Sequence, residues 1–233
     1  MRPVDATAPV AVALDAPNLE TAARWAEAVT PYVSTVKIGL ELYCRYGPDV
    51  VASVRGASGV DVFLDLKLHD IPATVAGAAH AVARLRPTYL TVHATGGSAM
   101  ISAAARAVPD TTIAAVTVLT SLGADDLAAV GLEGKPLDAA RRLSALAVEA
   151  GAGAIVCSPH EVAAVREEVG PDVTLIAAGV RPQGSESQDQ ARVATPREAL
   201  AAGADLLVIG RPITGAPDPG AAAASIAKRI RTS

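Results

Sequence analysis

Eight short apolar runs recur along the chain, and each is followed by a segment with the pattern of a helix. Apolar runs of about four to eight residues between turn-forming residues are typical of buried strands. Eight alternations of strand and helix within 233 residues predict one (β/α)8 TIM-barrel domain over residues 1–233, and a doubly wound open sheet is the alternative. The expected strands are residues 9–14, 33–39, 60–64, 89–93, 112–119, 154–158, 173–178 and 206–209.

Helices are expected between these strands, among them residues 41–54, 72–85 and 137–150. A polar insertion after the fifth strand is long enough for a short extra helix. Two segments fall outside the repeats: an N-terminal tail, residues 1–9, and a polar loop, residues 181–194, without helical or strand periodicity. Because long irregular loops in compact domains are often functional lids, we expect the loop to cover the phosphate side of a ligand.

The composition excludes several classes of protein. Hydrophobic residues make up 51% of the chain and aromatic residues only 3%, which suits parallel strands packed under Ala-rich helices. A net charge of -4 predicts no nucleic-acid or anionic-membrane partner. No apolar run reaches the ~20 residues of a membrane span, and the first residues lack an apolar signal core. Cys44 and Cys157 match no metal-ligand spacing, so we expect free thiols in a soluble, cytoplasmic protein.

Charged residues are concentrated at positions 65–70, at the end of the third apolar run. Period-2 alternation places Asp65 and Lys67 on one face of the strand, at its carboxyl end. Asp70 follows where the chain turns into the next helix, which Pro72 is suited to begin. A surface salt-bridge cluster is the alternative interpretation of this pattern.

Other polar residues also fall at the ends of expected strands, which is where the active site of such a barrel lies. Scattered surface charges would fall equally at the opposite ends and on the helices, so this placement favours an active site. Taken singly, Asp15 and Lys37 could equally be structural. The strand-end residues are Asp15, Lys37, Asp65, Lys67, Thr120, Arg181 and Arg211.

A phosphate site is expected after the last two strands. Gly179 and Gly210 follow strands seven and eight, where backbone N–H groups and the start of a short helix often bind phosphate. Arg211 would add a planar fork of donors, although a tight turn with a surface arginine is the alternative. Gln190, in the polar loop, is a further donor.

Other catalytic groups are less well indicated. His93, at the end of the fourth strand, is either catalytic or a hydrogen-bonding residue at the barrel mouth. No His/Asp/Glu cluster has the spacing of a zinc site, and no Ser-His-Asp triad can be assembled. We therefore predict no metal site, although carboxylates alone leave a Lewis-acid metal open.

These residues resemble the bacterial members of the orotidine 5'-monophosphate decarboxylase family. The resemblance runs from Leu14 to Ile213 and is most specific in the decapeptide at 65–74 and in the Gly-Arg-Pro-Ile at 210–213. It implies a barrel enzyme that converts orotidine 5'-monophosphate to uridine 5'-monophosphate and CO2, the last step of de novo pyrimidine synthesis. It also implies that the enzyme uses no cofactor.

The resemblance assigns the catalytic groups. Lys67 would donate the proton to C6, within a charged array that includes Lys37, Asp65 and Asp70. Loss of CO2 leaves a carbanion at C6, and a fixed cation beside C6 would stabilise it. Asp65 would lie close to the substrate carboxylate and disfavour it relative to the transition state.

The resemblance also assigns the binding groups. Asp15 and Lys37 would hold the ribose hydroxyls, and Thr120 would contact the pyrimidine edge. The phosphate side would be contacted by Arg181, Gln190, Gly210 and Arg211. Asp70, Ile71 and Thr74 would reach into the neighbouring subunit's site, which implies a homodimer with shared sites.

Two rival functions share parts of this pattern. A magnesium-dependent sugar-phosphate decarboxylase or aldolase of the same superfamily also carries the Asp-x-Lys-x-x-Asp strand end. The stretches 117–121 and 181–190 favour the nucleotide enzyme, and metal dependence separates the two. A non-catalytic phosphate-ligand sensor would bind without turnover, and the intact Asp65, Lys67 and Asp70 argue against it.

Overall fold

A computed structural model describes residues 7–132, 134–181 and 194–232. The strands are β1 Ala8–Ala13, β2 Val33–Gly39, β3 Asp61–Leu68, β4 Tyr89–His93, β5 Thr112–Val116, β6 Ala154–Cys157, β7 Thr174–Ala178 and β8 Leu206–Ile209. All eight are parallel and lie in sequence order, and β1 pairs with β8 to close the barrel. The predicted (β/α)8 barrel is confirmed, and the open sheet is wrong.

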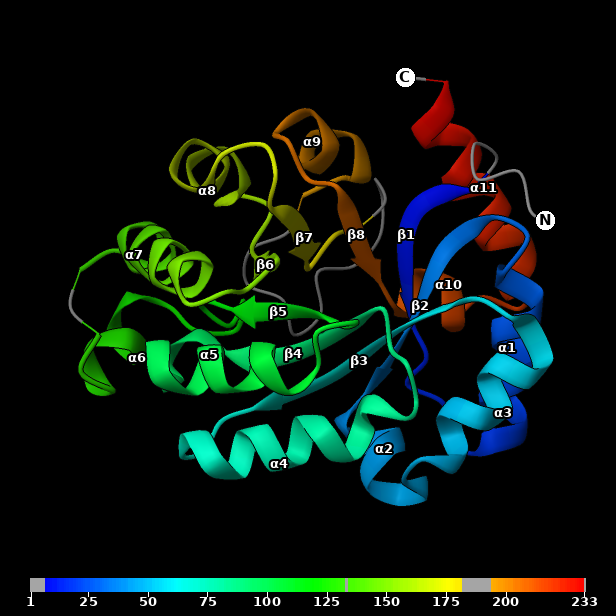
Figure 1. Cartoon of the computed structure of the whole chain (residues 1–233). Coiled ribbons are helices and arrows are strands. Elements are labelled where there is room, and N and C mark those ends of the chain that lie inside the picture. Colours follow the sequence, from blue (N-terminus) through cyan, green and yellow to red (C-terminus); the bar gives the residue numbers. More distant parts are fainter. Residues whose placement is uncertain (1–6, 133, 182–193, 233) are drawn as a thin grey trace.

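Helices surround the barrel and cover its strands (Figure 1). They are α1 Leu19–Val29, α2 Leu40–Tyr46, α3 Asp49–Ser58, α4 Pro72–Ala83, η2 Ala94–Gly96, α5 Ser98–Ala107, α6 Ala124–Ala129, α7 Pro136–Glu149, α8 Val162–Val169, α9 Pro196–Ala201, α10 Arg211–Thr214 and α11 Pro219–Arg231. The short extra helix expected in the polar insertion is α6. No helix in the described part of the chain is long and apolar enough to cross a membrane.

Several boundaries differ from the sequence prediction, and β3 runs to Leu68 although its apolar run ends at Leu64. The helix expected at 41–54 is two helices, because Gly47 adopts a positive φ and Pro48 follows it. The fifth strand ends at Val116, and the apolar residues after it continue as a loop. β1 begins at Ala8, so the last residues of the expected tail 1–9 belong to the strand.

Most of the polar loop predicted at 181–194 lies outside the described residues, and Gln190 lies there with it. Its two ends are joined. The Arg181 N–H donates to the Ala194 carbonyl at 2.9 Å, and Val180 forms an isolated parallel bridge with Ala194. Both ends of the loop are therefore fixed next to β7.

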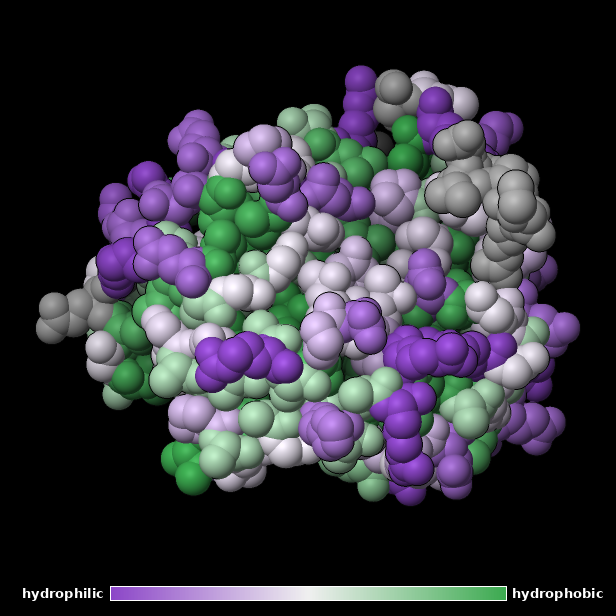
Figure 2. All heavy atoms as spheres, viewed as in Figure 1, coloured by the Kyte–Doolittle hydropathy of each residue, from purple (hydrophilic) through white to green (hydrophobic). Residues whose placement is uncertain are grey.

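Two apolar layers stabilise the barrel. The outer layer packs the strands against the helices, and the face in Figure 2 shows patches of hydrophilic side chains beside white and green ones, which also lie over α4 and α5. The inner layer fills the barrel itself with Ala11, Phe63, Ala114, Val116, Ala154, Val156, Ile176 and Leu206. Because five of these eight are alanine or valine, one large residue is needed to fill the centre.

Phe63 is that residue and the only phenylalanine of the chain. It is 1% exposed and packs edge to face on Tyr89, with ring centroids 5.7 Å apart.

We expect Phe63→Ala to lower the free energy of unfolding by about 3–5 kcal/mol, because the ring's burial is lost and a cavity remains. Urea denaturation measures this value. Val130→Ala, at a side chain 67% exposed, should change it by less than about 0.5 kcal/mol, and an equally small effect at Phe63 would contradict the packing described.

Candidate active site

A cavity of about 610 Å³ opens at the carboxyl ends of the strands. This is the end at which barrels of this type carry their active sites. It is lined by Ala13, Asp15, Lys37, Glu41, Phe63, Asp65, Lys67, Val116, Val118, Leu119, Thr120, Ser121, Val156, Cys157, Ala178, Gly179, Arg181, Val208, Gly210, Arg211 and Thr214. Residues from distant parts of the sequence therefore share one pocket.

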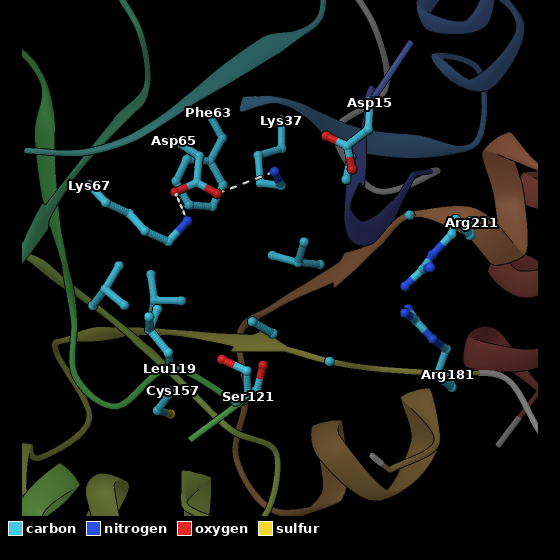
Figure 3. Close-up of a pocket in the computed structure, with 18 of the residues that line it drawn as sticks. Asp15, Lys37, Phe63, Asp65, Lys67, Leu119, Ser121, Cys157, Arg181 and Arg211 are labelled. Carbon is cyan, nitrogen blue, oxygen red and sulfur yellow. Dashed lines mark hydrogen bonds and ion pairs between the residues drawn. The ribbon is translucent and has the colours of Figure 1, made fainter. Parts of the chain in front are cut away.

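An acid between two lysines forms one end of the cavity (Figure 3). Lys37 Nζ lies 3.2 Å from Asp65 Oδ2, and Lys67 Nζ lies 2.8 Å from Asp65 Oδ1. The Asp65 and Lys37 side chains are only 10% and 12% exposed, whereas Lys67 is 31% exposed and reaches further toward solvent. The three groups carry a net charge of about +1, since one carboxylate faces two ammonium groups.

The charge state of Asp65 follows from these neighbours. Burial by itself raises the pKa of this carboxyl, but the Lys37 and Lys67 ammonium groups beside it outweigh burial and lower the pKa below its usual range. Asp65 is therefore ionised at neutral pH. A fixed negative charge in this position repels any second anion placed against Lys67.

Strand geometry brings these groups together. On β3 the side chains of Phe63, Asp65 and Lys67 all face the cavity, as alternation predicts. Lys67 nevertheless has a φ of 48°, which is uncommon for a residue other than glycine. Its placement therefore depends on contacts that hold this backbone conformation.

Gly39 leaves the space that the Lys37 ammonium group occupies. It pairs with Asp65 across the β2–β3 ladder. A Cβ at this position would lie 3.2 Å from Lys37 Nζ and 3.5 Å from Asp15 Oδ1. A side chain here would press on the Lys37 ammonium group, which would have to move by a few tenths of an ångström.

Two arginines form the opposite end of the cavity. Arg181 follows β7, and Arg211 begins α10 after β8. Figure 3 shows their guanidinium groups pointing toward one another, across the cavity from Lys67. Paired guanidinium groups bind phosphate and carboxylate oxygens well, so this end suits an anionic group.

The floor of the cavity is apolar. It is formed by inward-facing residues of several strands, including Phe63, Val116 and Val156. Charges above such a floor interact more strongly than they do in water, because the local dielectric constant is lower. The cavity thus has the Lys37–Asp65–Lys67 array at one end, two arginines at the other and an apolar floor.

Most of the predicted site residues meet in this cavity. Those that line it are Asp15, Lys37, Asp65, Lys67, Thr120, Gly179, Arg181, Gly210 and Arg211. Asp70, Ile71 and Thr74 do not line it; all three are exposed at the start of α4, and Ile71 is 66% exposed. Among the described residues, Asp70 forms no ion pair with Lys37 or Lys67, and its carboxylate accepts a hydrogen bond from the Ile71 N–H at 2.6 Å.

Several residues that line the cavity were not predicted from the sequence. Phe63 could have been found, because it lies two positions before Asp65 on the same strand face. Thr214 lies one helical turn after Arg211, but α10 is too short to give a periodic signal. Nothing in the sequence pattern marks Glu41 or Cys157 as part of the pocket.

His93 lies beside the cavity and not among its lining residues. Its ring stacks on that of His69 at a centroid distance of 5.3 Å, and its Nδ1 lies 2.7 Å from the Thr95 hydroxyl. Burial, followed by electrostatic repulsion from His69 and Lys67, lowers the pKa of His93. A neutral imidazole engaged in stacking fits the hydrogen-bonding role better than the catalytic one.

The described residues contain no group of three or more His, Cys, Asp or Glu side chains placed to hold a metal ion. The carboxylate at the centre of the site, Asp65, is instead engaged by two ammonium groups.

Comparison with known proteins identifies the family. The model of the orotidine 5'-phosphate decarboxylase / HUMPS family matches residues 8–226. The chain belongs to this family. The match includes every described residue of the cavity, from Ala13 to Thr214.

Individual members of the family are similar over nearly the whole chain. A protein of Thermobifida fusca (strain YX) named orotidine 5'-phosphate decarboxylase is 69% identical over 96% of both chains. A protein of the same name from Frankia casuarinae is 58% identical over 94% of this chain and 86% of its own. The crystal structure of orotidine 5'-phosphate decarboxylase from Lactobacillus acidophilus superposes with a TM-score of 0.83 at 36% identity, covering 95% of this chain and 98% of that one.

Proposed function

We propose that the chain decarboxylates orotidine 5'-monophosphate to uridine 5'-monophosphate and CO2 without a cofactor. The Lys37–Asp65–Lys67 array at one end of the cavity, opposite two arginines, is the observation that carries this proposal. A nucleotide has a phosphate at one end and a reacting base at the other, which matches the two ends of the cavity. The names of the family members support the same activity.

Lys67 is proposed to act at C6 of the pyrimidine. Its ammonium group is held at 2.8 Å from Asp65, so the positive charge is in place before the reaction begins. Loss of CO2 places negative charge on C6, and a preorganised cation stabilises this charge without reorganisation. The same ammonium group then donates a proton to C6 and yields the product.

Asp65 is proposed to have two roles. It fixes both lysines, and its negative charge lies next to the place that the substrate carboxylate must occupy. Because this repulsion disappears as CO2 departs, it favours the transition state over the bound substrate.

The remaining lining residues are proposed to bind the nucleotide. Arg181, Arg211 and the backbone of Gly210 would hold the phosphate, with Gln190 as a further donor. Asp15 and Lys37 would hold the ribose hydroxyls, and Thr120 the pyrimidine edge. Binding energy from the phosphate, far from C6, can then be used to hold the pyrimidine against the charged array.

A homodimer is also proposed. Asp70 lies outside the cavity of its own subunit, and the adjacent Ile71, a large apolar side chain at the start of α4, is 66% exposed. An exposed apolar side chain at this point favours contact with a second copy, which would bring Asp70, Ile71 and Thr74 to the partner's site.

We also propose a cytoplasmic location. Cys44 is exposed on α2, whereas Cys157 is buried at the end of β6, so the two thiols are not placed to pair with each other. An exposed thiol is typical of a reducing compartment.

The first experiment mixes orotidine 5'-monophosphate with EDTA-treated protein and follows loss of the orotate absorbance in the ultraviolet. We expect rapid loss of absorbance that added magnesium does not increase. No loss with this substrate, together with magnesium-dependent turnover of a sugar phosphate, would assign the chain to the rival superfamily members. Binding of the nucleotide without turnover would indicate a sensor.

Lys67→Ala tests the proposed proton donor. We expect the turnover number to fall by at least about 10⁴-fold, because both the cation and the proton are lost. Uridine 5'-monophosphate should still bind within about tenfold of the original affinity, since its phosphate contacts remain. Lys228→Ala, at an exposed lysine of α11, is the control and should retain activity. A Lys67→Ala enzyme that remains active would contradict the role of Lys67.

Mixed dimers test the shared site. Lys67→Ala and Asp70→Ala are each expected to be inactive alone. If Asp70 acts in the partner's site, each hybrid dimer contains one intact site, and an equal mixture should recover about a quarter of the original activity. Absence of recovery after subunit exchange has been demonstrated would show that Asp70 does not act across the interface.

A further inference from the structure

The pairing of β3 with β4 is interrupted beside the site. Phe63 pairs with Tyr89 and Leu64 with Leu90, but the ladder resumes only at Leu68 and Val92. The three residues 65–67 of β3 therefore lie opposite one residue of β4, Thr91. A bulge of this kind re-aims side chains and removes regular ladder hydrogen bonds.

The Thr91 side chain takes the place of the missing ladder contacts. Its hydroxyl accepts a hydrogen bond from the backbone N–H of Lys67 at 2.7 Å. The same hydroxyl donates to Asp65 Oδ1 at 3.0 Å. Asp65 Oδ1 in turn accepts from Lys67 Nζ at 2.8 Å. One hydroxyl thus connects the backbone of Lys67 to the carboxylate that holds its ammonium group.

Burial and the rigidity of the Thr91 side chain fix the direction of its two hydrogen bonds, to the Lys67 N–H and to Asp65. Thr91 is fully buried, and a β-branched side chain has few rotamers, so its hydroxyl has a fixed direction. Lys67 adopts a φ of 48°, a conformation that persists only where several surrounding contacts require it. A buried N–H group without an acceptor would destabilise this conformation further.

We propose that Thr91 is a positioning residue for the decarboxylation, fixing the backbone of Lys67 and the carboxylate of Asp65 relative to each other. Thr91 does not line the cavity and acts only through these two residues. This inference rests on the proposed function, because it assigns Thr91 to the step that Lys67 performs.

The test compares Thr91→Val, which keeps the shape and removes the hydroxyl, with Thr91→Ser, which keeps the hydroxyl. We expect kcat for orotidine 5'-monophosphate to fall about 10- to 100-fold in Thr91→Val, with KM changed less than about twofold. Thr91→Ser should recover kcat to within about fivefold of the original enzyme. If Thr91→Val does not fold, Thr91→Ala replaces it in the same comparison.

Thr111→Val is the matched control. Thr111 is also buried, and its hydroxyl donates to the Pro87 carbonyl at 3.0 Å, but it precedes β5 at the opposite end of the barrel. Its loss should leave kcat within about twofold of the original value. An equal fall of kcat in both valine variants would mean that Thr91 acts only through stability, and would overturn the proposal.

Three other results would also overturn the proposal: an unchanged kcat in Thr91→Val, a change confined to KM, or a Thr91→Ser enzyme as slow as Thr91→Val.

A second measurement, of hydrogen exchange, needs no variant and no substrate. Hydrogen exchange of the Lys67 amide should be slow in the original protein, and exchange as fast as that of an exposed loop would show that the bond to Thr91 is absent. Wild-type protein without decarboxylase activity would instead contradict the proposed function, and the exchange measurement would still decide the Thr91 contact.

Discussion

The candidate site depends on one buried carboxylate held between two ammonium groups. Removing Asp65 from water is costly, and only close opposite charges compensate for that cost. Lys37 and Lys67 provide them from adjacent strands, at 3.2 Å and 2.8 Å. Gly39, which pairs with Asp65 across the β2–β3 ladder, leaves room for this arrangement, because a side chain there would come close to the Lys37 ammonium group. The β2–β3 ladder therefore brings Lys37 beside Asp65, and the ion pair between them in turn links the two strands.

The rest of the cavity is arranged around this array. The inner layer of the barrel ends in apolar side chains that exclude water from below the charges, and Phe63 belongs to both the core and the cavity floor. The arginines come from β7 and β8, on a different part of the barrel wall from β2 and β3. Because the barrel is closed, these two cationic ends are held at a fixed separation. A closed framework suits a reaction that relies on preorganised charge.

Regular patterns made most of the fold predictable. The eight apolar runs gave the order of the strands, and alternation along β3 correctly placed Asp65 and Lys67 on the cavity face. The fifth strand was predicted too long because residues 117–119 are as apolar as the strand before them, although they form a loop over the cavity. Hydropathy does not distinguish these two environments.

Contacts between distant residues were not predictable in the same way. The hydroxyl of Thr91 meets Lys67 because the ladder skips residues between Leu64 and Leu68, and hydropathy contains no signal for such a bulge. Lining residues such as Glu41 and Cys157 are likewise placed by tertiary structure alone. Asp70 could be recognised from the motif, but the single chain does not contain the site in which it is proposed to act.

The bulge between β3 and β4 preserves the parity of the strand. From Leu64 to Leu68 the chain advances four residues while its partner advances two, from Leu90 to Val92, so the excess is an even number. Leu66 and Leu68 consequently continue to pack outward with Leu64 against the helical layer. An odd excess would keep this alternation only if one bulged residue left the extended conformation and shared a face with its neighbour. With an excess of two, β3 presents two charged side chains, Asp65 and Lys67, to the cavity opposite the single residue Thr91 of β4.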